Sequence, residues 1–504
     1  MFEFSIGDIY TQGWALLNFE VIVFLFAGTI AGVLIGAMPG LTATMGVAVV
    51  TPLTYGMSTI SSFALLLGVY CGGVYGGSIT AIVANIPGTP SAIMTTLDGY
   101  PMSRRGEAGK AIGIATVSSF IGGVISVVIL SFFAPMVANM ALKFSGQEFF
   151  AIGFFGLTVI AYISTGSMAR GFLSGFLGLL IGTIGADLIS GFERFTYGSF
   201  YLLSGIELLP VLIGVFGFTE ILCVLERGFT SIEVTKKTFD RVIPGKDDMK
   251  KILPTIFRSA PIGTIIGAIP AAGGVIAAIV AYGVEKRFSR NPEKFGTGAI
   301  EGIAAPETAN NACTGGAMIP MLTLGVPGDA ATAILIGALM MNGLTPGPTL
   351  FSRNMDVVSA IFILMLLANC VFLFYGLFGA RYIAKVISVP MKILAPVIAT
   401  LCIVGTFSLR NALFDVWVML FFGILGYWFR KVEIPTPPLA LGLVLGNLVE
   451  VEFRRGLILS RGNVFSFFTR PISGTFLLLS VLMLILPTIL SAITKRKGAG
   501  RITE

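Results

Sequence analysis

Polar side chains that could hold a charged solute gather beside four interruptions of otherwise apolar sequence. The interruptions are Pro39-Gly40, Pro87-Gly88, Pro270-Ala271 and Pro327-Gly328. A helix broken within a membrane frees N–H groups on one half-helix, which suit a carboxylate, and C=O groups on another, which suit a cation. The interruptions therefore predict a site for an anionic solute and a coupled cation.

The candidate ligands of that solute are hydroxyl, amide and backbone groups, which can hold a carboxylate without burying a competing fixed charge. Adjacent amides in apolar surroundings are costly unless they are partnered, so the Asn310-Asn311 pair is the strongest signal. Each Ser or Thr has the alternative of bonding to its own helix. The predicted substrate-binding residues are Gly40, Thr42, Thr44, Ser78, Asn85, Pro87, Gly88, Thr89, Asn310, Asn311, Thr314 and Gly328.

Two acidic residues, Glu307 and Asp329, lie in or near the predicted spans. An ionisable residue inside a membrane marks an ion or substrate route by default, so cation coupling is one interpretation. A solvated helix end is the other. Asp187, Glu207 and Glu220 lie near the ends of ordinary spans, where snorkelling or structural pairing is expected.

The composition excludes several kinds of chemistry. Histidine is absent, which removes His metal ligands, Ser-His or Cys-His nucleophiles and His proton relays. No nucleotide-binding P-loop pattern is present. We therefore expect neither catalysis nor a bound cofactor. The cysteines form no CxxC and are interpreted as small buried residues: Cys71, Cys223, Cys313, Cys370 and Cys402.

The elements that must position these residues are membrane helices. The chain is 55% hydrophobic and 12% charged, with a mean hydropathy of +0.91. Apolar runs of roughly 20 residues, long enough to cross a bilayer, recur along it. The net charge of +7 comes largely from basic residues in short loops, as the positive-inside rule produces. We predict an all-α polytopic membrane protein with about 10–12 transmembrane or re-entrant segments.

Two apolar stretches, residues 28–101 and 259–349, repeat each other. Ile35 to Pro39 matches Ile266 to Pro270, and Ile86 to Gly88 matches Val326 to Gly328. Between these matches, Gly76-Gly77 aligns with Gly315-Gly316, with about one residue inserted along the repeat. Paired, interrupted hydrophobic segments indicate a secondary transporter's binding site. The alternative is that Gly and Pro only pack helices, as Gly28, Gly32 and Gly36 are expected to do.

The distribution of Lys and Arg predicts the topology. No basic residue precedes Arg104, and the long loop 226–258 is rich in Lys, so the N-terminus is expected outside and this loop inside. The two repeats would then be inverted. Proline residues predict a short or broken helix over 434–450. The predicted regions are repeat cores at 18–102 and 259–351, four helices over 103–225, the cytoplasmic loop 226–258, C-terminal helices over 352–494 and a basic tail at 495–504.

Three composite stretches resemble the large membrane subunit of the tripartite tricarboxylate transporters. They are MPGLTATMGVAVVTPLTYGM (38–57), YCGGVYGGSITAIVANIPGTPSAIMTTLDGYPM (70–102) and EGIAAPETANNACTGGAMIPMLTLGVPGDAATAILIGALMMNGLTPGPTLF (301–351). The resemblance covers nearly the whole chain. It implies a multi-pass importer of the bacterial inner membrane that takes up tricarboxylates, dicarboxylates or other organic carboxylates, with a sodium ion or proton as the coupling ion.

The same resemblance implies two protein partners, a small membrane subunit of four helices and a periplasmic solute-binding protein. A nucleic-acid partner is not expected. A single-component carboxylate–cation symporter and an anion channel are the alternatives, and solute counterflow distinguishes a carrier from a channel. A membrane enzyme is a further rival, for which the sequence offers no catalytic constellation.

Overall fold

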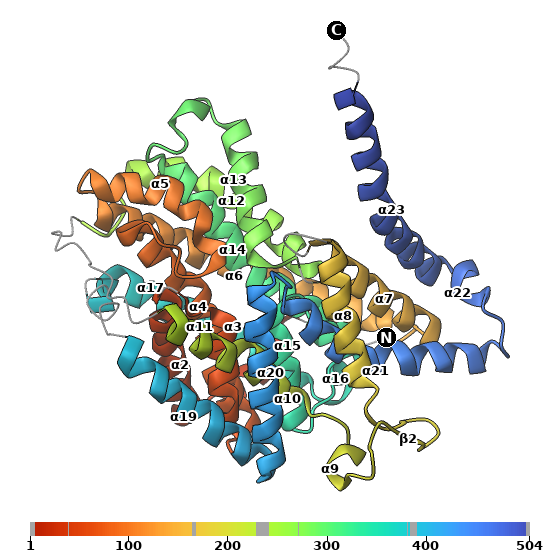
Figure 1. The fold of residues 1–504 in the computed structure, drawn as a ribbon. Coiled ribbons are helices and arrows are strands. Elements are labelled where there is room, and N and C mark those ends of the chain that lie inside the picture. Colours follow the sequence, from red (N-terminus) through yellow and green to blue (C-terminus); the bar gives the residue numbers. More distant parts are fainter. Residues whose placement is uncertain are drawn as a thin grey trace. The chain divides into compact units, whose positions relative to one another are not determined.

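The computed structural model describes residues 6–38, 40–163, 168–227, 241–270, 272–380, 382–383 and 391–499 (Figure 1). Within these ranges the chain is almost entirely helical, and seven helices are long and apolar enough to cross a membrane. The one small sheet pairs β1 (Gly185–Ala186) with β2 (Glu193–Arg194). The prediction of an all-α polytopic membrane protein is confirmed. Pro39 and Ala271, at two predicted interruptions, lie outside the described residues.

The chain divides into two compact units, residues 1–142 with 207–428 and residues 143–206 with 429–504. The second unit contains α7 (Gly146–Ile163), α8 (Met168–Gly182), α21 (Pro437–Leu459), α22 (Ser466–Thr469) and α23 (Pro471–Ala499). In that unit α21 packs on both α7 and α8. The predicted group of four helices over 103–225 is therefore divided between the two units.

The first unit contains both interrupted stretches. Its first half comprises α1 (Ile6–Ala15), α2 (Phe19–Ala37), α3 (Ala43–Val50), η1 (Thr51–Thr54), α4 (Thr59–Ala84), η2 (Pro90–Ala92), α5 (Ile93–Arg104) and α6 (Ala108–Ala141). Its second half comprises α10 (Leu208–Leu212), η3 (Ile213–Phe218), α11 (Thr219–Arg227), α12 (Lys246–Ala268), α13 (Gly273–Phe288), η4 (Pro292–Lys294), α14 (Ile300–Leu324), α15 (Ala330–Met341), α16 (Pro348–Arg353), α17 (Met355–Phe378), α19 (Met391–Arg410) and α20 (Leu413–Lys431). A short helix, α9 (Phe200–Leu203), belongs to the second unit.

Capping side chains define where several of these helices begin. Asn18 accepts a hydrogen bond from the Val21 N–H at the start of α2, and Thr42 accepts one from the Met45 N–H at the start of α3. Asp329 caps α15 by accepting from the Thr332 N–H at 2.7 Å. Such caps satisfy N–H groups that have no partner inside the helix. The starts of the short helices that follow two of the interruptions are thus encoded locally.

Helices α2 and α4 run parallel, packed through the small residues of α2. A Cβ added to Gly28 would overlap the Leu65 carbonyl, and one at Gly36 would overlap the Gly73 carbonyl. Between them, Gly32 lies against Val69. The close backbone approach confirms the packing role predicted for this glycine ridge.

Helices α12 and α14 repeat this arrangement. Gly263 lies against the Ala309 carbonyl and Gly267 against the Cys313 carbonyl, again in parallel order. These contacts pair the residues of α4 and α14 with a shift of one residue from the pairing that the Gly-Gly motifs gave in the sequence. Gly76 meets Val33, and its counterpart Gly316 meets Thr264, so Gly76 corresponds to Gly316 and not to Gly315. The helix that follows each repeat packs on the other one, α6 on α14 and α17 on α4.

Three details differ from the sequence prediction. Most of the stretch 434–450 belongs to a continuous helix, α21, because Pro437 and Pro438 lie at its first positions, where a missing N–H costs nothing, and Pro435 precedes the helix. Helix α12 begins at Lys246, so the second part of the predicted loop 226–258 is helical. Cys370 is exposed, whereas the other four cysteines are buried, and all five are free thiols.

Candidate functional site

Two re-entrant tips bring the interruptions of each repeat together. After α4, Asn85 adopts a left-handed backbone (φ 60°), and the chain turns back so that the Gly88 N–H donates to the Gly77 carbonyl at 3.2 Å. A Cβ on Gly88 would overlap the Gly36 carbonyl at the end of α2. Only a glycine allows this approach, which places the first two interruptions of the repeat side by side.

The second repeat has the same construction. Gly325 is left-handed (φ 70°) at the end of α14, in the place that Asn85 occupies after α4. A Cβ on Gly328 would collide with Ala317 and with the Gly267 carbonyl at the end of α12. Gly88 and Gly328, both predicted site residues, therefore shape the backbone of the two tips.

The first tip meets the start of α13 and the middle of α14. A Cβ on Gly274 would overlap Oδ1 of Asn310 and would lie 3.4 Å from Cβ of Ser91. Asn310 is 2% exposed, and its Nδ2 donates to the Val74 carbonyl of α4 at a long 3.4 Å. No side chain caps the first N–H groups of helix α13. Thr89, also buried, shares a hydrogen bond with Ser91 at 3.1 Å. We call Thr89, Ser91, Gly273, Gly274 and Asn310 the amide crossing.

The second tip meets α4 and packs beside α3, and it is acidic. Oδ2 of Asp329 accepts a hydrogen bond from the Tyr70 hydroxyl at 2.7 Å. Near the first interruption, a Cβ on Gly40 would lie 3.3 Å from Oε1 of Glu220, which is 4% exposed. Glu220 thus lies buried beside a break. Of the two roles expected from its position in the sequence, snorkelling and structural pairing, its burial is inconsistent with snorkelling. Tyr70 in α4 corresponds to Asn310 in α14. The Tyr70–Asp329 contact, which we call the acidic crossing, is therefore the counterpart of the amide crossing but contains an acid.

Most of the remaining predicted ligands form hydrogen bonds within their own helices. The Ser78 hydroxyl donates to the Tyr75 carbonyl, the Asn311 amide to the Glu307 carbonyl and the Thr314 hydroxyl to the Asn311 carbonyl, all within one helix. Thr42 is the cap of α3. Thr44 and Pro87 are partly buried, and Asn85 is exposed. Of the amide pair, only Asn310 reaches another helix.

Glu307 is fully buried on α14, three residues before Asn310 of the amide crossing. Its Oε1 accepts a hydrogen bond from the Thr95 hydroxyl of α5, and its Oε2 accepts one from the Ser119 hydroxyl of α6 at 3.2 Å. No Lys or Arg of the described ranges forms an ion pair with it. An acid held only by hydroxyl groups suits a proton or a small hard cation, which prefers oxygen ligands.

Asp98 is a buried acid that sequence reasoning missed. Its Oδ1 accepts three backbone hydrogen bonds, from Gly296, Gly298 and Ala299, at 2.8–2.9 Å. Its Oδ2 accepts from the Tyr282 hydroxyl at 2.9 Å. Asp98 therefore fastens α5 to the segment before α14. The spacing of Ser91, Thr95 and Asp98, which places all three on one helical face, is the signal that could have revealed them.

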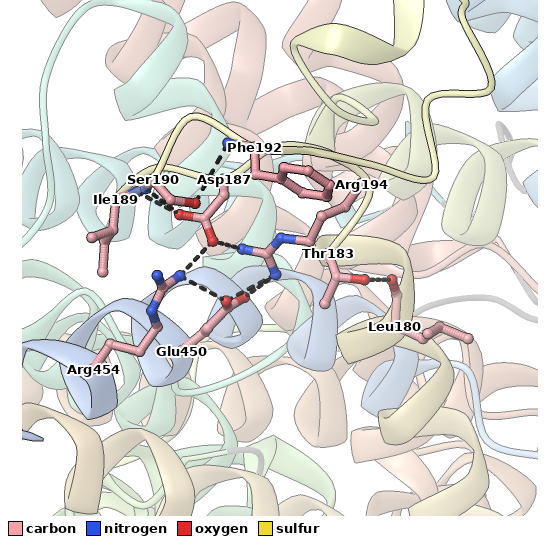
Figure 2. A network of polar contacts seen from close by, with 9 residues as sticks. All are labelled: Leu180, Thr183, Asp187, Ile189, Ser190, Phe192, Arg194, Glu450 and Arg454. Carbon is pink, nitrogen blue, oxygen red and sulfur yellow. Dashed lines mark hydrogen bonds and ion pairs between the residues drawn. The ribbon is translucent and has the colours of Figure 1, made fainter.

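A separate polar cluster lies in the second unit (Figure 2). Arg194 pairs with Glu450 at 2.8 Å, and both Arg194 and Arg454 pair with Asp187. The backbone N–H groups of Ser190 and Ile189, with the Arg454 guanidinium, hold the pKa of Asp187 well below its usual range. The cluster borders a cavity of about 100 Å³. Structural pairing, the role expected for Asp187, accounts for these contacts.

Comparisons with known proteins identify a family and two relatives. Residues 22–441 match the sequence model described as "Tripartite tricarboxylate transporter TctA family". An uncharacterised 52.8 kDa protein of Agrobacterium vitis, from the TAR-I ttuC' 3' region, is 37% identical over 473 residues, which are 93% of this chain and 94% of the relative. A second uncharacterised A. vitis protein, from the TAR-II ttuC' 3' region, is 38% identical over 232 residues, 45% of this chain and 96% of the relative. No solved structure matches.

Proposed function

Because this chain belongs to the tripartite tricarboxylate transporter TctA family, we propose that it is the large permease subunit of a secondary transporter that imports organic carboxylates, driven by a cation gradient and dependent on a binding protein. Its membership of a transporter family and its helices of membrane-spanning length agree with a multi-pass membrane carrier. No catalytic step belongs to this function.

The amide crossing is the observation that carries the proposal. It combines the uncapped start of α13, a buried amide on Asn310 and the hydroxyl groups of Thr89 and Ser91. These are donors, and an acid is not among them. A carboxylate leaving water needs its hydration replaced by such donors, and the positive end of a helix favours it further. We assign a substrate carboxylate to this crossing.

The arrangement of the repeats supports alternating access. Within each repeat the paired helices are parallel. Between repeats, the start of α14 lies by α5, while Tyr70 of α4 reaches the tip after α14, so α4 and α14 run in opposite directions. We infer two inverted repeats related through the crossings. Rocking of one against the other would expose the amide crossing to each side in turn.

We assign the chain to the bacterial inner membrane, with two partners that follow from the family: a small four-helix membrane subunit and a periplasmic solute-binding protein. The coupling ion is a sodium ion or a proton. Glu307 and Asp329 are the candidate groups, and Asp329 already has both oxygens occupied by the α15 cap and by Tyr70. A single-component symporter differs only in needing no binding protein, while a channel would not show counterflow.

Reconstitution tests this function. Proteoliposomes containing all three subunits should accumulate a radiolabelled carboxylate from a panel of tri- and dicarboxylates when sodium or proton gradients are imposed. Preloading with unlabelled solute should accelerate uptake of the labelled solute. An uptake rate that depends on neither gradient, together with an absence of counterflow, would favour a channel. Equal uptake without the binding protein would favour the single-component symporter.

A further inference from the structure

A row of polar side chains connects the amide crossing to one end of α14. Along η2 and α5, Ser91, Thr95 and Asp98 share one face because they are spaced at helical intervals. Each meets a position of α14 in descending order: Ser91 lies near Asn310, Thr95 bonds Glu307, and Asp98 lies against Gly302. We call this contact between α5 and α14 the polar seam.

The seam has an apolar counterpart in the other repeat. Counting on from the equivalent tips Gly88 and Gly328, the residues that correspond to Ser91, Thr95 and Asp98 are Ala331, Leu335 and Ala338. The residue of α4 that corresponds to Glu307 is Leu67, which is fully buried. The positions equivalent to the seam are therefore apolar in the other repeat. Since burying polar side chains in a membrane protein is costly, the polarity of the seam calls for a role beyond folding.

The end of the seam at the start of α14 is fastened by the buried Asp98 and by Arg105 at the surface. While Asp98 accepts the N–H groups of residues 296, 298 and 299, Arg105 donates to the Thr297 carbonyl at 2.6 Å and to the Gly298 carbonyl at 3.2 Å. Gly302 has no Cβ, and one there would overlap Oδ2 of Asp98. This segment lies on the side of the loop before α12, because α12 and α14 are parallel. The topology predicted from the Lys and Arg distribution assigns that side to the cytoplasm.

The corresponding end of the other repeat is hollow. A cavity of about 320 Å³ is lined there by Tyr55, which precedes α4, and by Gly337 and Met340 of α15. Where α5 carries Asp98, α15 carries Ala338, which has no polar side-chain group to form such a clamp. The end of the seam is thus closed by hydrogen bonds, whereas the corresponding end of the other repeat has a cavity, whose lining includes the ion-paired Glu207, Arg410 and Asp415.

From these observations, and resting on the proposed function, we propose that the polar seam is the route by which the coupling cation reaches the cytoplasm, with Glu307 as its binding station and Asp98 as the latch that opens to release it. The ligand is a small monovalent cation, a proton or a sodium ion. Thr95 and Ser119 hold the carboxylate of Glu307 in place, and the carboxyl of Glu307 carries the exchangeable charge.

The test separates solute exchange from coupling. In proteoliposomes with all three subunits, Glu307→Gln should retain carboxylate counterflow within twofold of wild type, because an amide resembles the protonated acid and exchange needs no gradient. Gradient-driven accumulation should fall at least tenfold.

Thr95→Val, which keeps the side chain's shape, should shift the cation concentration for half-maximal uptake at least threefold and leave the solute KM unchanged. Asp248→Asn, which breaks the 2.8 Å ion pair with Lys110 away from the seam, is the control and should match wild type.

Full gradient-driven accumulation by Glu307→Gln would overturn the proposal. Loss of counterflow together with accumulation, in a variant that inserts normally, would also overturn it, since Glu307 would then serve the solute or the fold. Imposing sodium and proton gradients separately identifies the ion.

A second measurement does not depend on any solute. A hydrophobic carbodiimide modifies protonated carboxyl groups, and peptide mass spectrometry of the assembled complex reports the modification of Glu307. The modification should fall with rising sodium if sodium binds, or only with rising pH if a proton binds. A Glu307 that stays unmodified, or whose modification follows neither variable, contradicts cation access. If the cation protects Glu307 from modification but no carboxylate is transported, the proposed substrate class is wrong. The proposed cation route through the polar seam then still holds.

Discussion

At the scale of single residues, the two neighbouring amides of α14 behave differently. Asn310 reaches α4 and the start of α13, whereas Asn311 bonds the carbonyl of its own helix at Glu307. We therefore expect Asn310→Ala to raise the solute KM roughly ten- to hundredfold, the effect of about 1.5–3 kcal/mol for a lost hydrogen bond to a charged group. Asn311→Ala is the matched control and should change the KM by less than threefold. Equal effects would remove Asn310 from the site.

A second residue-scale prediction concerns pH and Asp187. Its pKa is lowered in the folded protein by N–H groups of Ser190 and Ile189 and by Arg454, so its contribution to stability is present above the unfolded pKa of about 4 and is lost as the pH falls toward the folded pKa. Asp187→Asn should therefore lower the Tm of the complex at pH 7, and the difference from wild type should shrink at pH 3. A Tm difference that is constant between these pH values would contradict this account.

At the scale of elements, the glycines of the two parallel pairs predict paired effects. Gly32→Ala and Gly263→Ala both push a Cβ into a facing carbonyl, at Val69 and at Ala309, and should each lower the free energy of unfolding by about 1–3 kcal/mol, as overpacking does. Gly283→Ala on α13 meets nothing within 4 Å and is the control. Denaturation of purified protein measures all three. A neutral Gly263→Ala beside a harmful Gly32→Ala would argue against equivalent repeats.

Much of this arrangement could be predicted from the sequence, and the exceptions have physical causes. The interruptions, the glycine ridge and the amide pair carry strong local signals, because Pro and Gly change backbone conformation wherever they stand. The role of Asp98 depends on a segment 200 residues away in the chain, at Gly298, and no local pattern reports such a contact. Likewise, Ser78 and Thr314 have the composition of ligands, but only packing decides that they bond to their own helices.

At the scale of the whole molecule, the predicted topology remains to be measured. The N-terminus is expected outside and the start of α12 inside, because basic residues are missing before Arg104 and abundant before α12. Single cysteines at Asp8 and Lys246, in a background without native cysteines, should react with an impermeant thiol reagent from opposite sides of the membrane. Reaction of both from the same side would show that the repeats are not inverted.

The exchange of neighbours between the repeats has a consequence for synthesis. Helix α4 is covered on one side by α17, through the stacking of Tyr75 on Phe372 with ring centroids 4.9 Å apart. Translation at about 5–20 residues per second means that roughly 15–60 s pass between the emergence of α4 and that of α17. During that interval the flank of α4 that carries Tyr75 lacks its α17 neighbour. The packing of α14 is not delayed in this way, because its neighbour α6 is synthesised before it. The nascent first half is therefore the stage at which membrane chaperones or quality-control proteases would meet this chain.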